Sequence, residues 1–143
     1  MQVIPAVCIV APHRYAGKTK LVSSLITYLS SLGYKVASAK HVHEEIDVKD
    51  KDTQLHGKAG AMLTVAISEE GIAIFEWNKR LTIEATIKDL LDKGFKGLFI
   101  CEGFKSSSLP KIALAISDKD DLFVKSLDGV IAVVAMPQLR TKL

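Results

Sequence analysis

The chain has 143 residues, of which 48% are hydrophobic and 24% charged, as expected for a globular protein with a sizeable core. The formal net charge of +3 is spread along the sequence beside acidic residues, which argues against a nucleic-acid binder. No apolar stretch approaches the ~20 residues of a membrane span, and we expect no signal peptide. The composition predicts a cytoplasmic protein with one domain, residues 1–143.

The first segments predict a strand, a loop, a helix and a second strand. Residues 6–10 form a short apolar run typical of a buried strand. Apolar side chains recur at helical spacing from Leu21 to Leu32, and Gly33 ends that helix. Residues 35–41 predict the second strand. This order is the βαβ unit of a parallel sheet.

The rest of the chain alternates in the same way after a polar loop at residues 42–52. Asp52 is expected to cap a short helix that reaches about Ala59. Residues 62–67 and 72–77 predict a β-hairpin with a four-residue connection, and Thr82 caps a helix that ends near Gly94. Three further strands are predicted at residues 97–101, 111–116 and 129–134. The fold class is therefore α/β, with a mostly parallel twisted sheet of about seven strands, flanking helices and a β-hairpin.

Two cysteines, Cys8 and Cys101, lie in two of the apolar runs with β character. We expect buried reduced thiols there, which suit a reducing compartment, rather than a disulfide. The hairpin at residues 72–77 is apolar on both faces. It is expected either to form an interface in a homodimer or to pack inside its own subunit.

The connection from the first strand to the first helix ends in Gly17-Lys18-Thr19, as a phosphate-binding P-loop does. Helix-start amides have no intrahelical partners, and the helix dipole adds positive charge there. Lys18 can reach the β- and γ-phosphates of a nucleotide, and the Thr19 hydroxyl can hold Mg²⁺. The sequence predicts a P-loop NTPase-like site whose nucleotide-contacting residues are Tyr15, Ala16, Gly17, Lys18, Thr19 and Lys20.

The loop departs from the usual pattern at Pro12, where G-x-x-x-x-G-K-[ST] has glycine. Pro12 lies at the end of the strand, where the loss of glycine costs least, although a chance G-K-T sequence stays an alternative. Arg14 either contributes a second cation to the phosphates or points into solvent.

Two further groups follow predicted strands, where ligands of a parallel sheet bind. Lys40-His41-Val42-His43 precedes several acids. We expect these acids to bind Mg²⁺ or its water shell and the cations of the loop to meet a charged substrate; a transition-metal site and a solvated loop are the alternatives. Glu102 follows an apolar strand, where a P-loop enzyme places an acid near Mg²⁺ and the attacking water. Lys111 either faces the same edge or is an exposed lysine at a strand start.

Several motifs occur together in this order: G-K-T, K-H-x-H, K-D-T-x-x-x-x-K-A-G-A from residue 51, E-G-F-K from residue 102, P-K-I from residue 110 and V-I-A-V-V from residue 130. The chain thereby resembles the MobB family of molybdopterin-guanine dinucleotide biosynthesis accessory proteins. The resemblance implies a P-loop fold that binds GTP with Mg²⁺, hydrolyses it slowly and often dimerises. It also implies a partnership with the guanylyltransferase that attaches GMP to molybdopterin.

Carried over by position, the resemblance implies that His41, Asp47, Asp52 and Glu102 line the active site. The expected catalytic residues are then Lys18, Glu102 and Asp47, and the expected metal ligands are Thr19, Asp52 and Glu102. The leading hypothesis is a Mg²⁺-dependent GTP-binding protein with slow GTPase activity. The alternative is a degenerate adaptor that binds nucleotide or molybdopterin without hydrolysis. A small-molecule kinase would need an arginine-rich lid, and only Arg80 lies between Arg14 and Arg140.

Overall fold

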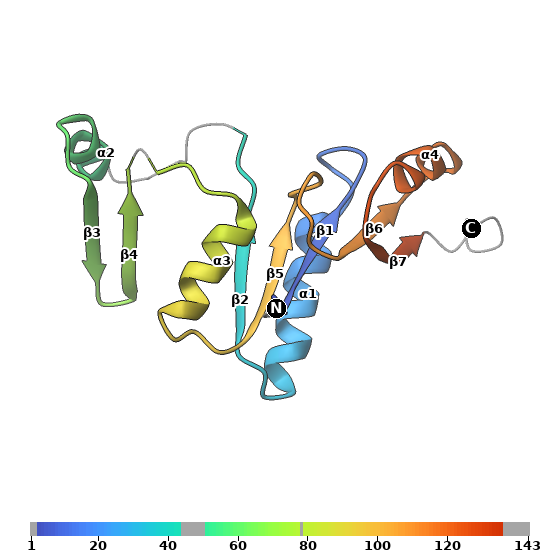
Figure 1. The fold of residues 1–143 in the computed structure, drawn as a ribbon, viewed down its shortest axis with the longest axis horizontal. Helices are drawn as coiled ribbons and strands as arrows, with labels where there is room; N and C mark the ends of the chain where they lie inside the picture. Colours follow the sequence, from blue (N-terminus) through green and yellow to red (C-terminus); the bar gives the residue numbers. More distant parts are fainter. Residues whose placement is uncertain (1–2, 44–50, 78, 136–143) are drawn as a thin grey trace. The chain divides into compact units, whose positions relative to one another are not determined.

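The computed structural model describes residues 3–43, 51–77 and 79–135 (Figure 1). Contacts divide the chain into two compact units, one comprising Met1–His41 with Thr82–Leu143 and the other Val42–Leu81. We call them the sheet unit and the hairpin unit, and each is described by itself. The prediction that residues 1–143 form one domain stays a prediction.

The sheet unit contains a five-stranded parallel sheet in the order β2-β5-β1-β6-β7. Its strands are β1 (Ala6–Val10), β2 (Val36–Lys40), β5 (Leu98–Glu102), β6 (Lys111–Ala115) and β7 (Val130–Ala135). The middle strand β1 is apolar throughout, as expected for a central parallel strand that is covered on both faces. Cys8, Ile9 and Val10 are accordingly 0% exposed.

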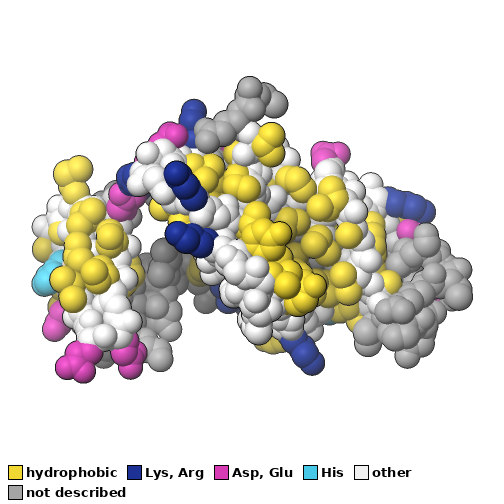
Figure 2. All heavy atoms as spheres, turned by 90° about the horizontal axis from the view of Figure 1, so that it is seen from below, with side chains coloured by type: hydrophobic (Ala, Val, Ile, Leu, Met, Phe, Trp, Pro, Cys, Tyr) yellow, Lys and Arg dark blue, Asp and Glu magenta, His cyan; other side chains and the backbone are white. Residues whose placement is uncertain are grey.

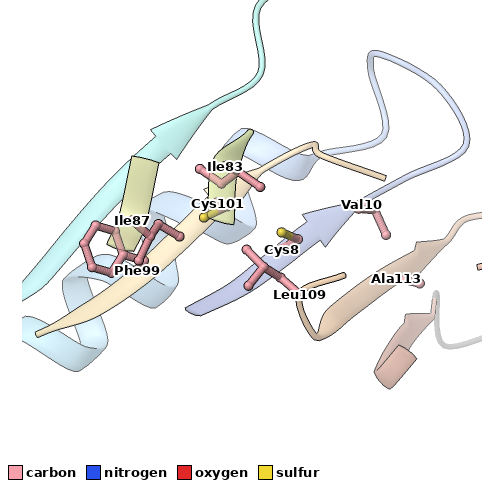
Figure 3. Packing of buried hydrophobic residues seen from close by; sticks show 8 residues of the cluster. All are labelled: Cys8, Val10, Ile83, Ile87, Phe99, Cys101, Leu109 and Ala113. Atoms are coloured by element: carbon pink, nitrogen blue, oxygen red, sulfur yellow. The ribbon is translucent and has the colours of Figure 1, made fainter. Parts of the chain in front are cut away.

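Alternate residues of the strands pack into two apolar clusters. Helix α1 (Lys18–Ser31) contributes Val22 and Leu25 to the cluster that contains Ile9, Ile100 and Leu114. The other cluster, drawn in Figure 3, joins helix α3 (Ile83–Asp92) to side chains of β1, β5 and β6. Helix α3 begins as predicted, because the Thr82 hydroxyl accepts a hydrogen bond from the Ala85 N–H at 3.2 Å.

Two short elements follow β6 that the sequence analysis did not predict. They are a 3₁₀ turn (Asp118–Asp120) and helix α4 (Asp121–Lys125). Their signal is a capping box, in which Ser117 and Asp120 exchange side-chain and main-chain hydrogen bonds. The helix was missed because its five residues are too few to show a helical period.

The hairpin unit consists of helix α2 (Lys51–Lys58) and an antiparallel two-stranded sheet, β3 (Leu63–Ser68) with β4 (Gly71–Glu76). The predicted hairpin is present, but Ser68 pairs with Gly71, so its connection has two residues instead of four. Helix α2 begins at Lys51, so Asp52 lies in its first turn rather than at its cap. The seven predicted strands are thus all found among the described residues, five in one sheet and two in the other.

The hairpin presents one apolar face to solvent. The pairing places Val65 opposite Ile74 and Ile67 opposite Ile72. All four side chains are between 46% and 75% exposed, and Figure 2 shows hydrophobic side chains on the surface of this unit. The fold of the hairpin does not bury this face among the described residues of its own unit.

No helix in the described part of the chain is long and apolar enough to cross a membrane.

Candidate functional site

The loop of residues 11–17 leads from the central strand β1 into helix α1. Gly17 forms the N-cap of α1 with φ 88° and ψ 14°, a left-handed conformation that favours glycine. Among the described residues no side chain caps α1, and its first turn contains no acid. The helix start therefore keeps main-chain N–H groups and dipole charge available to an anion.

Lys18 lies across this loop. Its ammonium donates hydrogen bonds to the carbonyl oxygens of His13 at 3.0 Å and Arg14 at 3.5 Å. Burial lowers the pKa of Lys18, and the positive charges of Lys105 and Lys40 lower it further, whereas Glu102 acts in the opposite direction. Lys18 is therefore a partly buried cation that one acidic and two basic side chains influence.

Glu102 ends strand β5 directly beside the loop. Parallel pairing places it opposite Ile9 of β1 and opposite Lys40 of β2. The Thr19 hydroxyl donates a hydrogen bond to Glu102 Oε1 at 2.9 Å. A hydroxyl and a carboxylate oxygen are the kinds of ligand that hold Mg²⁺ in P-loop sites, so the chemistry of Thr19 and Glu102 would suit a magnesium ion.

The backbone turns sharply after Glu102, and Gly103 then lies close to His41, which follows strand β2. Gly103 has φ 94°, and an added Cβ would lie 3.0 Å from His41 Cβ, so only glycine fits there without a shift. The His41 N–H donates to the Glu102 carbonyl at 2.9 Å. The His41 ring stacks on Phe104 with centroids 5.1 Å apart.

The structure therefore brings Lys18, Thr19 and Glu102 together at the start of α1 and places His41 beside Glu102. Tyr15 and Lys20 are exposed beside them, and Ala16 is buried in the apolar cluster beneath α1. Asp47 lies outside the described residues. Asp52 belongs to the hairpin unit, so its role as a metal ligand stays a prediction.

The described residues contain no group of three or more His, Cys, Asp or Glu side chains suited to a metal. Mg²⁺ often takes only one or two protein ligands and completes its shell with water and phosphate oxygens, so a magnesium site stays a prediction. The described residues thus give no support to the alternative of a transition-metal site at His41 and His43.

Two lysines at the site were missed as site residues. Lys40 pairs with Glu102 in the sheet, and Lys105 lies three residues after Glu102 in the chain. The positive charges of both lysines lower the pKa of Lys18. Lys40 belongs to the Lys40-His41-Val42-His43 group, which the sequence placed at a ligand-binding strand end without giving the lysine a role of its own. The position of Lys105 could not be predicted, because it depends on the turn at Gly103.

The cysteines and Lys111 lie in the interior of the sheet unit. Cys8 and Cys101 are free, buried and opposite each other on β1 and β5, which confirms the prediction of buried reduced thiols. A hydrogen bond within the pair raises the pKa of Cys101 and lowers that of Cys8 to about 7. Lys111 is 0% exposed, so the expectation of an exposed lysine at a strand start was wrong.

A central parallel strand, a glycine-ended loop, an uncapped helix start and a converging lysine, threonine and glutamate define the P-loop class of α/β fold. Residues 6–136 match the family described as MobB, molybdopterin guanine dinucleotide synthesis protein B. The chain belongs to this family.

Curated relatives carry the corresponding name. A molybdopterin-guanine dinucleotide biosynthesis adapter protein of Haemophilus influenzae is 29% identical over 101 residues, which are 69% of this chain and 57% of that protein. A provisionally named adapter of Methanocaldococcus jannaschii is 31% identical over 114 residues, 76% of this chain and 46% of that protein. The chain thus spans about half the length of the curated relatives it matches.

Solved structures show the same fold. Bacillus subtilis MobB superposes with a TM-score of 0.69 and 22% identity, over 92% of this chain and 77% of that one. A MobB homologue from Bacillus stearothermophilus gives a TM-score of 0.68 and 21% identity, over the same shares of the two chains.

Proposed function

We propose that the chain is a Mg²⁺-dependent GTP-binding protein with slow GTPase activity that assists molybdopterin-guanine dinucleotide biosynthesis. The observation that carries the proposal is the uncapped start of α1, where Lys18 and the Thr19–Glu102 pair converge. The pathway is supported by family membership and by the adapter names of the curated relatives.

The chemistry follows from the placement of these groups. Lys18 and the amides at the start of α1 would hold the β- and γ-phosphates and stabilise the charge that develops during phosphoryl transfer. Thr19 and Glu102 would hold the metal, which when bound neutralises charge on the phosphate oxygens. Glu102 either remains a metal ligand or orients the attacking water, and Asp47 is the second candidate for that role.

The proposed partner is the guanylyltransferase that attaches GMP to molybdopterin, with molybdopterin as a further ligand. The adapter names of the relatives support a role beside another enzyme of the pathway. A cytoplasmic location stays a prediction.

The function is tested by calorimetric titration of the purified chain with GTP, GDP and ATP, with and without Mg²⁺. We expect GTP binding that strengthens with Mg²⁺. Lys18→Ala should weaken it at least 100-fold, and Glu102→Gln should remove mainly the Mg²⁺-dependent part. Lys96→Ala, at an exposed lysine between α3 and β5, is the matched control and should bind as the parent does. Absence of GTP binding to the parent protein would refute the proposal.

The non-hydrolysing adaptor is the second candidate, and the bulky residues from Pro12 to Tyr15 favour it. Both candidates bind GTP, so phosphate release separates them. The GTPase predicts slow release that Lys18→Ala abolishes, whereas the adaptor predicts release equal to that of the Lys18→Ala variant.

We also propose that the chain forms a homodimer through the apolar face of the hairpin. This face, made of Leu63, Val65, Ile67, Ile72 and Ile74, is at least 46% exposed at each residue. It lies on one side of a regular antiparallel pair, so two copies related by a two-fold axis present identical apolar surfaces to each other. Burial of such a surface is the main driving force of association.

The dimer is tested by sedimentation equilibrium with Ile67→Lys combined with Ile72→Lys. Both side chains are exposed, so the substitutions should weaken dimerisation at least 100-fold and leave the monomer folded. Tyr28→Lys, at an exposed position of α1, should not change the dimer. A parent protein that is monomeric at every concentration would overturn this proposal and leave GTP binding untouched.

A further inference from the structure

Three side chains form a row across the middle of the parallel sheet. Cys8 of β1 pairs with Cys101 of β5 on one side and with Lys111 of β6 on the other. Paired residues of neighbouring strands lie on the same face of a sheet, and Figure 3 shows the two cysteines on the face that helix α3 covers. All three residues are 0% exposed. The row therefore places a buried thiol between a second thiol and a buried lysine.

The strand pairing gives the two free cysteines a spacing that suits a disulfide. Neighbouring strands lie about 4.8 Å apart, and the two Cα atoms of a disulfide are separated by ~4.4–6.8 Å. The thiols of Cys8 and Cys101 already form a hydrogen bond with each other. A bond between the two sulfur atoms therefore requires no change in the pairing of β1 and β5.

Cys8 is the more reactive member of the pair. Its sulfur lies 3.6 Å from the Ser107 hydroxyl, and Ser107 is only half-buried, so this contact leads from the thiol toward the surface. The pKa of Cys8 is lowered to about 7, first by the hydrogen bond with Cys101 and then by Ser107 and the positive charge of Lys111, which together outweigh burial. Neutral pH therefore gives Cys8 more thiolate, the form that attacks an oxidant, than an ordinary cysteine has.

The burial of the pair determines which oxidant it can accept. A protein or peptide disulfide cannot bring its sulfur atoms to a thiol that is 0% exposed, whereas hydrogen peroxide is little larger than water. We infer that Cys8 and Cys101 are a peroxide-sensitive pair, which hydrogen peroxide converts into a disulfide between β1 and β5. The inference goes beyond the proposed function and does not depend on it.

The reaction consumes one hydrogen peroxide for each pair. The Cys8 thiolate attacks one peroxide oxygen, so an S–O bond forms, the O–O bond breaks, and the leaving hydroxide takes up a proton to give water. Cys101 then loses its proton and attacks the Cys8 sulfur, so the S–S bond forms, the S–O bond breaks and a second water leaves. The two thiols lose two electrons and two protons in total, and the peroxide is reduced to two water molecules. The disulfide links the strand before the loop of residues 11–17 to the strand that ends in Glu102.

The test is oxidation of the purified, reduced chain with hydrogen peroxide under native conditions. The remaining thiols are alkylated in denaturant, and the chain is digested with trypsin for mass spectrometry. Trypsin separates the cysteines, because Cys8 lies in the fragment of residues 1–14 and Cys101 in that of residues 97–105. We expect these two fragments to be joined by a disulfide that dithiothreitol breaks. The rate should rise in proportion to the peroxide concentration, because the pair reacts in the folded chain.

Two variants with one cysteine each serve as matched controls, and circular dichroism checks that both remain folded. Cys101→Ala should form no disulfide between these fragments, and its Cys8 should be oxidised to the sulfinic acid instead. Cys8→Ala removes the attacking thiol, so its Cys101 should stay reduced at least ten times longer than the pair does in the parent protein.

The outcomes that overturn the inference are distinct. Fragments that stay unlinked in the parent protein, whether alkylated or oxidised to the sulfinic acid, would refute the peroxide-sensitive pair. So would a rate that does not depend on peroxide concentration, because the thiols would then react only after the chain unfolds. Equal oxidation of Cys101 with and without Cys8 would refute the assignment of Cys8 as the attacking thiol. None of these outcomes depends on nucleotide binding.

Discussion

The two units of the chain place their apolar side chains in opposite environments. In the sheet unit, strand β1 is buried on both faces, and helix side chains pack against Ile9 and Cys8 from different clusters. In the hairpin unit, β3 and β4 leave a row of Leu, Val and Ile side chains exposed to solvent. The first arrangement stabilises a fold that can hold a rigid ligand site, and the second leaves a surface available for association.

The contrast also separates the proposed roles. The charged groups that converge on α1 all belong to the sheet unit, so a change confined to the hairpin is expected to alter assembly and spare nucleotide binding. Three predictions test this separation, beginning with the largest expected effect.

One isoleucine from each unit gives the most direct comparison. Ile87 is 1% exposed and Ile74 is 62% exposed. Ile87→Ala should lower the free energy of unfolding of the sheet unit by about 2–5 kcal/mol, because it leaves a cavity. Ile74→Ala should change stability by no more than about 0.5 kcal/mol when the chain is monomeric. Urea denaturation followed by circular dichroism measures both, and similar losses would show that the two environments do not differ as described.

Packing between helix α2 and Trp77 tests whether the hairpin unit has a specific interior of its own. A Cβ added at Gly57 would lie 2.5 Å from the Trp77 ring, whereas one added at Gly71 meets nothing within 4 Å. Gly57→Val should therefore destabilise the hairpin unit by about 1–3 kcal/mol, as overpacking does.

The readout is selective because Trp77 is the only tryptophan in the sequence, so its fluorescence during urea unfolding reports on this unit. Gly71→Val is the matched control in the same hairpin and should have a smaller effect. A loss of stability in Gly71→Val as large as that in Gly57→Val would show that contact with the Trp77 ring does not cause the effect.

A smaller, pH-dependent effect is expected at Asp120 in the sheet unit. Its carboxylate accepts hydrogen bonds from the N–H groups of Ile116 at 2.7 Å and Ser117 at 2.9 Å, which lower its pKa below the ordinary 3.8. Because the pKa is lower in the folded state, the stabilisation is present above pH 3.8 and is lost as the pH falls through the folded pKa.

Asp120→Asn should therefore cost about 1 kcal/mol at neutral pH, since a charged acceptor is replaced by a neutral one. The difference from the parent protein should shrink as the pH falls below 3.8 and vanish below the folded pKa. Thermal unfolding at a series of pH values measures it. A constant difference across this range would show that ionisation of Asp120 contributes nothing.

Local patterns in the sequence predicted most of the fold. Strand β1 was predicted with its observed bounds, and α1, α3 and the hairpin were found from periodicity and from caps such as Thr82. These features depend on residues close in the chain, whose spacing is visible without the structure. Helix α4 lacked such a pattern because it is too short.

Part of the candidate site was likewise predictable from local sequence, and part was not. The sequence by itself determined the Gly17-Lys18-Thr19 helix start and the acid at a strand end, because glycine conformation and strand length are local properties. Only the tertiary structure decided that Thr19 meets Glu102 across 83 residues of sequence. It also decided that Lys111 is buried, since its hydrogen-bond acceptors come from turns that adjoin only after the parallel strands have paired.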